Sequence, residues 1–276
     1  MKTFIFSSAL LLLSAMADAQ FRMPQPSPTQ TVKQDFGMGA IELNYSRPAA
    51  KGRKIMGDLV PYNKMWRTGA NATTKITFTT PVEIGGKKID TGSYAIYTIP
   101  GEKSWEVIFN KGFKNQSVLD YKEAEDVARV TVKTEKLKDK MGSFTMQLED
   151  VLPESCNLVL AWEETKVSVP IKTDVKTPLR ANLETALQSE KKPHWAAAQF
   201  YNEYDNNKAK ALEHVSSALN ENPKAFWMWL YKARIQKDMG DKAGAMESSK
   251  KSLELATEQK NDDYIKMNRE LQASLK

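Results

Sequence analysis

The stretch CNLVLAWEETKVSVPIKTDVKTPLRANLETAL (residues 156–187) contains the change of pattern that decides the fold. Up to about residue 173, apolar and polar residues alternate, which is typical of half-buried β-strands. The alternating apolar residues are Leu158, Leu160 and Trp162, followed by Val167, Val169 and Ile171. After TDVKTPLRANL, apolar residues recur at helical spacing. We therefore expect an α+β chain of two domains, a β domain that ends near residue 173 and an all-α domain after it.

The same alternation extends upstream to about residue 31, as in Ile41, Leu43 and Tyr45. The segment EIGGKKI (residues 83–89) predicts a β-hairpin, because Gly85 and Gly86 can adopt the positive φ of a two-residue turn. Between residues 112 and 125 the alternation lapses, and we expect a loop or a short helix there. Many short strands separated by turn residues predict a β-sandwich of about eight to ten strands over residues 31–173.

The helical part repeats itself. Trp195 and Trp229 are 34 residues apart, as are Ala211 and Ala245. A period of 34 residues is the length of a tetratricopeptide repeat, which is a helix–turn–helix unit. We therefore expect a helical domain over residues 174–276, with two such repeats at about residues 192–225 and 226–259 and capping helices at about 178–190 and 261–275. Whether these helices bind a protein partner or only pack against the sandwich is left open by the pattern.

The first 19 residues have the features of a signal peptide: Lys2, an apolar run, and the cleavage motif Ala17-Asp18-Ala19. We expect cleavage after Ala19, a Pro-rich lead-in over residues 20–30, and an exported protein, periplasmic or secreted, with no transmembrane segment after cleavage. A retained membrane anchor is the alternative, although the run is short for a span of about 20 residues. Cys156 is the only cysteine, so the chain cannot form an internal disulfide.

Positive charge is concentrated in one segment. Between Arg47 and Lys75 lie seven basic residues and one acidic residue, Asp58, an excess equal to the formal net charge of +6 of the whole chain. Prolines and glycines within the segment fix its backbone, and arginine binds carboxylate or phosphate groups bidentately. We therefore expect an anionic ligand, which could be a glycan, a phosphate polymer or an acidic peptide. The candidate binding residues are Arg47, Lys51, Arg53, Trp66, Arg67 and Asn71.

Other interpretations of this segment remain open. It could be a solvated loop that only carries charge. If Trp66 and Thr68 face one side of a strand, Arg67 faces the other and could be the buried partner of an acid such as Asp58 or Glu42. Nucleic acid is not expected as a partner, because the aromatic residues are not interleaved as stacking platforms.

The residue inventory does not require an enzyme. His194 and His214 are the only histidines and both lie in the helical part, so a Ser-His-Asp or Cys-His arrangement inside the sandwich is excluded. Neither has a Cys, Asp or Glu at zinc-ligand spacing, and we expect no metal and no cofactor. The alternative to a binding or scaffold module is a carboxylate-dependent hydrolase of envelope polymers. Its candidate residues are Asp58, Glu123 and Asp126.

Several segments together carry a resemblance to a known family. The segments YSRP, KGRKIMG, LVPYNKMWRTGANATTKITF, GSYAIYTIPG and AWEETKVSVPI resemble the secreted bacterial domain-of-unknown-function family 2911 over about residues 25–172. The resemblance implies an exported protein in which tetratricopeptide-like helices follow the β domain. That family has no established activity, so the resemblance implies no catalytic or binding residue.

Overall fold

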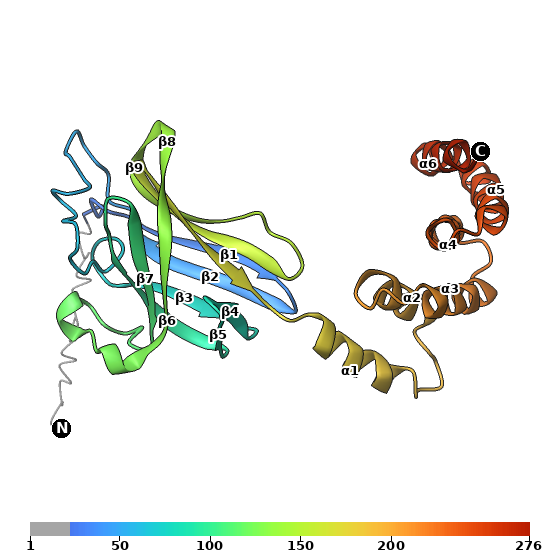
Figure 1. Cartoon of the computed structure of the whole chain (residues 1–276), viewed down its shortest axis with the longest axis horizontal. Coiled ribbons are helices and arrows are strands. Elements are labelled where there is room, and N and C mark those ends of the chain that lie inside the picture. The colour runs from blue at the N-terminus through green and yellow to red at the C-terminus, as the bar shows by residue number, and fades with distance from the viewer. Residues whose placement is uncertain (1–22) are drawn as a thin grey trace, which may run out of the picture.

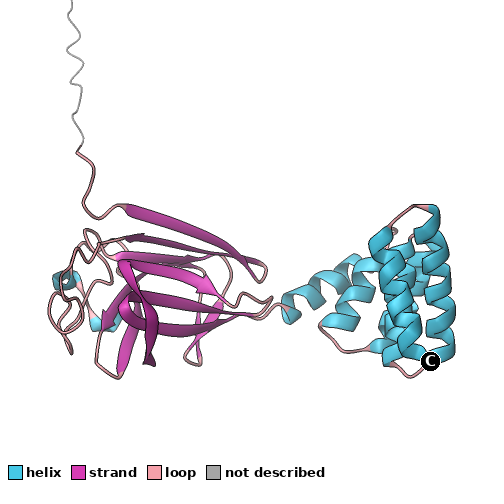
Figure 2. Cartoon of the chain, turned by 90° about the horizontal axis from the view of Figure 1, so that it is seen from above, coloured by secondary structure: helices cyan, strands magenta, loops and turns pink. Residues whose placement is uncertain are grey.

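The computed structural model describes residues 23–276. The expected signal peptide and the first residues of the lead-in, 1–22, lie outside the described residues. Within residues 23–276, nine strands are followed by six α-helices, which confirms the predicted fold class of a β domain followed by a helical one. Figures 1 and 2 show the strands and the helices at opposite ends of the molecule, with the first helix between them.

The strands form an antiparallel sheet in the order β1-β2-β3-β6-β7-β8-β9-β4-β5. Their bounds are β1 (Thr29–Phe36), β2 (Gly39–Ser46), β3 (Thr74–Phe78), β4 (Val82–Ile84), β5 (Lys87–Ile89), β6 (Gly92–Ile99), β7 (Ser104–Asn110), β8 (Asp126–Glu149) and β9 (Ser155–Lys172). β8 is long enough to pair with β7 through its first part and with β9 through its second. It is therefore the strand that joins the two halves of the sheet.

The sheet folds over, so that β2 faces the second part of β8. The Tyr45 hydroxyl donates to the Met146 carbonyl oxygen at 3.0 Å and accepts from the Met146 N–H at 2.9 Å. The Tyr45 ring meets the edge of Phe144, with centroids 5.8 Å apart. The core between the two layers holds the alternating residues that the sequence predicts, among them Ile41 and Leu43, both fully buried. Alternation thus fixed which face of each strand is buried.

The predicted turn elements are present. β4 and β5 form a hairpin, and Gly85 and Gly86 at its turn have φ values of 59° and 76°. A side chain at Gly85 would also collide with Val130, so glycine is required there by both backbone and space. Between β7 and β8 the structure has two short 3₁₀ helices, Val118–Asp120 and Glu123–Glu125, where the alternation lapses.

The helices are α1 (Lys176–Ala186), α2 (His194–Glu203), α3 (Lys208–Glu221), α4 (Phe226–Asp238), α5 (Lys242–Glu258) and α6 (Asp262–Leu275). The predicted turn residues between paired helices have positive φ, 51° at Asn206 and 83° at Gly240. Ala211 and Ala245 are fully buried. Two helical hairpins, α2–α3 and α4–α5, therefore stand where the repeat predicts them, and their assignment to the tetratricopeptide type remains an interpretation of the sequence.

Few polar contacts connect the two parts. The Thr173 hydroxyl donates to the Pro81 carbonyl oxygen at 2.9 Å, and the Val175 N–H donates to a Glu154 carboxylate oxygen at 3.0 Å. Beyond them, Lys176 of α1 forms an ion pair with Asp205, after α2, at 3.1 Å. The α1 helix is thus bonded to the helical part, and the junction lies at residues 173–175.

Within residues 23–276, no helix combines the length and the apolar character that crossing a membrane requires.

Candidate functional site

The loop over residues 47–73 joins β2 to β3 and carries all six predicted ligand-binding residues. Partners distant in sequence hold its backbone. The Phe144 N–H donates to the Pro48 carbonyl oxygen at 2.9 Å, and the Ile55 N–H donates to a Glu163 carboxylate oxygen at 3.0 Å. Trp66 exchanges two backbone hydrogen bonds with Thr98 of β6, at 2.7 and 2.9 Å. The loop is therefore fixed in shape by its contacts with β6, β8 and β9.

One local expectation about this loop is wrong. Residues 66–68 are not a strand: Trp66 forms a single isolated bridge with Thr98, and Thr68 has a left-handed φ of 58°. The left-handed turn breaks the alternation of faces. Thr68 is fully buried through its hydroxyl contact with Thr98 at 3.1 Å.

A cavity of about 400 Å³ opens between this loop and the strands, and we call it the arginine cavity. Three of the six predicted residues line it, namely Arg53, Trp66 and Arg67. The rest of its wall is mainly apolar and includes Leu59, Val60, Met65, Val118 and Trp162. None of its described lining residues is acidic. The cavity thus combines two guanidinium groups with an apolar wall.

Arg67 is the residue that sets this cavity apart. Its Nε atom is buried, and within residues 23–276 it has no hydrogen-bond partner. The guanidinium forms no ion pair with any described residue, so neither Asp58 nor Glu42 is the buried partner considered from the sequence. Trp162, which also lines the cavity, has a buried indole N–H with no partner among the same residues. Two residues of the cavity lining therefore each hold a buried donor without an acceptor among the described residues.

The other two arginines are bonded to the fold. Arg47 donates from Nε to the Phe144 carbonyl oxygen at 3.2 Å and from Nη2 to the Thr145 hydroxyl at 2.8 Å. Arg53 donates from Nε to the Ala50 carbonyl oxygen at 3.0 Å and from Nη2 to that of Ala49 at 2.7 Å. Arg47 does not line the arginine cavity, whereas Arg53 does. Both arginines support the shape of the loop.

Lys51 and Asn71 lie outside the cavity lining and have left-handed φ values of 50° and 58°. Lys51 is exposed. The Asn71 side-chain amide donates at 3.1 Å to both Gln25 Oε1 and the Ser27 carbonyl oxygen. Asn71 therefore holds the segment before β1 at the rim of the cavity, where Ser27 is one of the lining residues.

Aromatic rings form the floor beneath the loop. Trp66 stacks on Trp162 with centroids 6.0 Å apart and an interplanar angle of 21°. Its ring also meets the edges of Phe144 at 5.0 Å and Trp105 at 6.2 Å. Because Trp105 and Trp162 are only 1% exposed, this cluster belongs to the domain core as well as to the cavity wall.

Two candidate carboxylates of the alternative hydrolase, Asp126 and Glu123, lie beside Arg129. Asp126 accepts from the Tyr121 hydroxyl at 2.8 Å and from Arg129 Nη2 at 3.1 Å. Burial, followed by the hydrogen bond to Asp126, raises the pKa of Tyr121 to about 12. Glu123 lies 3.8 Å from the same Arg129 nitrogen and is largely exposed, and Asp58 is exposed in the loop. These contacts describe an ion-paired surface cluster, not an acid–base couple.

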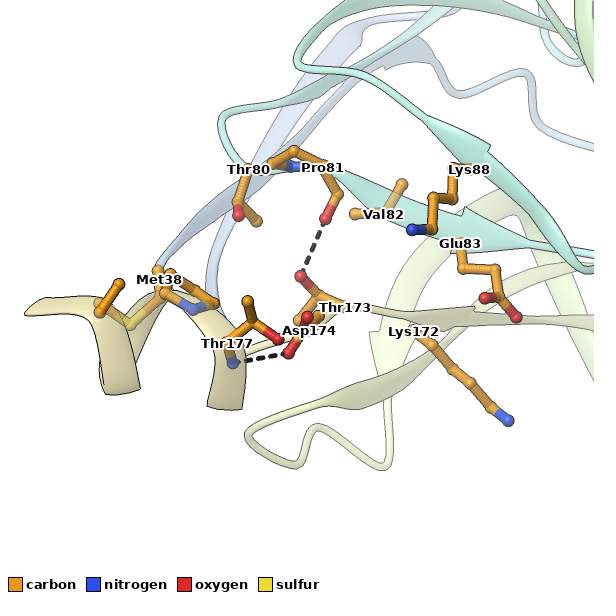
Figure 3. A pocket seen from close by; sticks show the side chains of 12 residues that line it. Met38, Thr80, Pro81, Val82, Glu83, Lys88, Lys172, Thr173, Asp174 and Thr177 are labelled. Carbon is orange, nitrogen blue, oxygen red and sulfur yellow. Dashed lines mark hydrogen bonds between the residues drawn. The ribbon is translucent and has the colours of Figure 1, made fainter. Parts of the chain in front are cut away.

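A second cavity, of about 600 Å³, lies at the junction between the sheet and α1 (Figure 3). Two of its polar side chains already have partners: Thr173 donates to the Pro81 carbonyl oxygen, and Asp174 accepts from the Thr177 N–H at 3.0 Å. Its rim carries both signs of charge, including Lys88 beside Glu83. This mixture favours no particular class of ligand.

The histidines make a contact that the sequence analysis missed. The Nδ1 atoms of His194 in α2 and His214 in α3 are 2.9 Å apart, within hydrogen-bonding distance. Burial, and then the charge of His194, hold the pKa of His214 below its ordinary value of 6.5. Among residues 23–276, no group of three or more His, Cys, Asp or Glu side chains is arranged to hold a metal ion.

The matched region of a known protein family covers the β domain. A family model with the description "Protein of unknown function (DUF2911)" matches residues 27–171, more than half of the chain. The matched range contains the loop over residues 47–73 and every residue that lines the arginine cavity. No curated protein matches the chain.

Proposed function

This chain belongs to the DUF2911 family, and for it we propose a binding function: the β domain holds an anionic group in the arginine cavity. The resemblance and the leader sequence support a position of this binding module in the cell envelope or outside the cell. The helical part then provides a surface for a protein partner. In this proposal the protein is a scaffold that joins an anionic ligand to that partner.

The observation that carries the proposal is the unpartnered Arg67. Burying a donor without an acceptor costs about 1–3 kcal/mol, and more when the group is charged. Most buried arginines recover this cost through an acid or a carbonyl group, as Arg47 does here. A bound carboxylate or phosphate would supply the missing acceptor, with charge-assisted hydrogen bonds of about 1.5–3 kcal/mol. The absence of an acidic residue among the described lining residues leaves the positive potential available to a ligand.

The hydrolase alternative receives less support. A pair of carboxylates that hydrolyses glycosides must face one substrate across a separation of about 5–9.5 Å. Asp126 is instead bonded to Tyr121 and Arg129, and Asp58 is exposed in the loop. We therefore keep binding without catalysis as the single proposal.

The test is equilibrium binding of three anionic probes: polygalacturonate, polyglutamate and inorganic phosphate. We expect at least one to bind and to weaken with added salt, because exposed charge pairs are screened. Arg67→Met should weaken that binding at least about tenfold, the loss of one charge-assisted contact. Arg269→Met is the matched control, since Arg269 is exposed on α6 in the helical part.

Two results would overturn the proposal. One is that none of the probes binds the parent protein at low salt. The other is that Arg67→Met and Arg269→Met bind the best probe as the parent does.

A further inference from the structure

We infer that the ligand group in the arginine cavity is a single carboxylate carried by an apolar body, such as the end of a hydrophobic amino acid or of a peptide. This inference rests on the proposed function and narrows it to one chemical class. It depends on the hydrogen-bond donors of the cavity lining and on the polar side chains that the lining lacks.

The free hydrogen-bond donors of the lining fit one carboxylate group. The Nε–Nη edge of a guanidinium presents two parallel N–H groups, which fit the two oxygens of a carboxylate. In Arg67 this edge is unused within the described residues, and its Nε is buried. Two nitrogens of Arg53 are already bonded to carbonyl oxygens. The cavity lining therefore offers one guanidinium without a partner among residues 23–276 and a second that is partly engaged, which is a small set for a phosphate polymer of high charge.

The side chains of the cavity lining are poorly suited to a sugar. A uronic acid carries several hydroxyl groups, each of which needs a partner once it is removed from water. Among the lining residues only Ser27 has a side-chain hydroxyl, and none is Asn, Gln, Asp or Glu. A sugar ring in this cavity would have only the guanidinium groups, Ser27 and the loop backbone as partners for its hydroxyls, beside the side chains of Leu59 and Met65. The same wall suits an aliphatic or aromatic group.

Two exposed hydrophobic side chains mark where that group would lie. Leu59 is 45% exposed and Val118 is 36% exposed, and both line the cavity. They come from separate elements, the loop after β2 and the 3₁₀ helix before β8, yet they meet at one opening. At about 400 Å³ the cavity is of the size that holds a small molecule or one chain end.

The experiment is isothermal titration at low salt with four probes. N-acetyl-leucine supplies a carboxylate and an apolar side chain, N-acetyl-leucinamide lacks the charge, glucuronate lacks the apolar group, and inorganic phosphate lacks both the planar carboxylate and the apolar group. We expect N-acetyl-leucine to bind most tightly, and the other three to bind at least about tenfold more weakly, the usual effect of a lost group in a fitted pocket. A peptide that ends in leucine, titrated beside N-acetyl-leucine, distinguishes a chain end from a free acid: tighter binding of the peptide indicates a chain end, and equal binding a free acid.

Variants of the apolar wall test the inference separately from the proposed function. Leu59→Ser and Val118→Ser should weaken N-acetyl-leucine about three- to tenfold while leaving glucuronate unchanged. Leu119→Ser is the matched control, because Leu119 is 91% exposed beside Val118 and does not line the cavity. Circular dichroism checks that each variant is folded.

The outcomes separate the two claims. If glucuronate or phosphate binds the parent more tightly than N-acetyl-leucine and Arg67→Met abolishes that binding, the inference is wrong and the proposed function stands. If the wall variants bind N-acetyl-leucine as the Leu119→Ser control does, the inference is likewise wrong. If no anion binds the parent, both fail.

Discussion

Replacing Arg67 by methionine should make the protein more stable, although Arg67 is the central residue of the arginine cavity. Methionine retains a long unbranched side chain and removes the charge and the N–H groups. A buried donor without an acceptor costs about 1–3 kcal/mol. Because Arg67 is only partly buried and the outer end of its side chain can remain hydrated, we take the lower end of this range. The free energy of unfolding should rise by about 1 kcal/mol.

Urea denaturation at 25 °C measures this change. Tryptophan fluorescence is a suitable signal, since Trp66 and Trp162 lie in the cavity wall and lose their packing on unfolding. With a urea dependence of about 1–3 kcal/mol per molar, the midpoint should move upward by about 0.3–1 M. The matched comparison is Arg53→Met. This variant loses two hydrogen bonds to backbone carbonyl oxygens and should unfold at lower urea than the parent.

The sign of the change in the free energy of unfolding shows whether Arg67 stabilises or destabilises the fold. If Arg67→Met lowers the free energy of unfolding by more than about 1 kcal/mol, Arg67 stabilises the fold, and the argument for an unpartnered guanidinium is refuted. A gain in stability together with a loss of anion binding is the expected exchange at a binding site, where a group is kept for its ligand at a cost to the fold.

Three further predictions test other parts of the molecule. The pKa of His214 in the folded protein lies below its ordinary value of 6.5. Between these two pKa values the unfolded chain binds more protons than the folded one. The free energy of unfolding of the helical part is therefore highest above about pH 6.5 and falls as the pH drops toward the folded pKa. Thermal melts of the parent at pH 7.5 and 5 should show this loss, and His214→Gln should remove most of the difference; a parent with equal melting temperatures would contradict it. Tyr45→Phe leaves the buried Met146 N–H without its acceptor and should cost about 1–3 kcal/mol in urea denaturation, whereas an unchanged midpoint would show that this contact is dispensable. Cys156 is 3% exposed and burial raises the pKa of its thiol to about 11, so Ellman's reagent at pH 8 should label it only after denaturation, and rapid labelling of the native protein would be evidence against this packing.

The fold was predictable where a local pattern determines a local structure. Alternation identified Ile41 and Leu43 as core residues, because successive side chains of a strand point to opposite faces. Gly85 and Gly86 identified a turn, because few other residues adopt positive φ at both positions. In each case the cause lies within a few residues along the chain.

The candidate site was predictable only in part, because its shape depends on distant partners. The sequence picks out the basic loop, but not which of its residues share a cavity. Trp162 and Val118 line the cavity with Arg67 although they come from β9 and from the segment before β8. The loop path that unites them depends on bonds to Phe144 and Glu163. No local pattern in residues 47–73 encodes those contacts.

The histidine contact could be narrowed down from the sequence but not fixed by it. His194 begins one helix of the predicted hairpin and His214 lies in the next helix. Two antiparallel helices joined by a short turn bring residues at equal distances from that turn side by side. His194 lies 12 residues before Asn206 and His214 lies 8 residues after it, a mismatch of about one helical turn. The pairing of the helices therefore brings the two histidines to neighbouring turns, and the contact itself depends on how the helices pack.

The position of β8 in the sheet has a consequence for the order in which the chain folds. The sheet cannot close until β8 is present, and contacts such as that of Tyr45 with Met146 join residues 101 positions apart. Closing such long loops is slow, whereas the helical hairpins make local contacts and form quickly. The N-terminal half of the chain therefore cannot complete its sheet before β8 and β9 are made. Until then its apolar strand faces are exposed and can aggregate. In this protein the part made first should finish folding last.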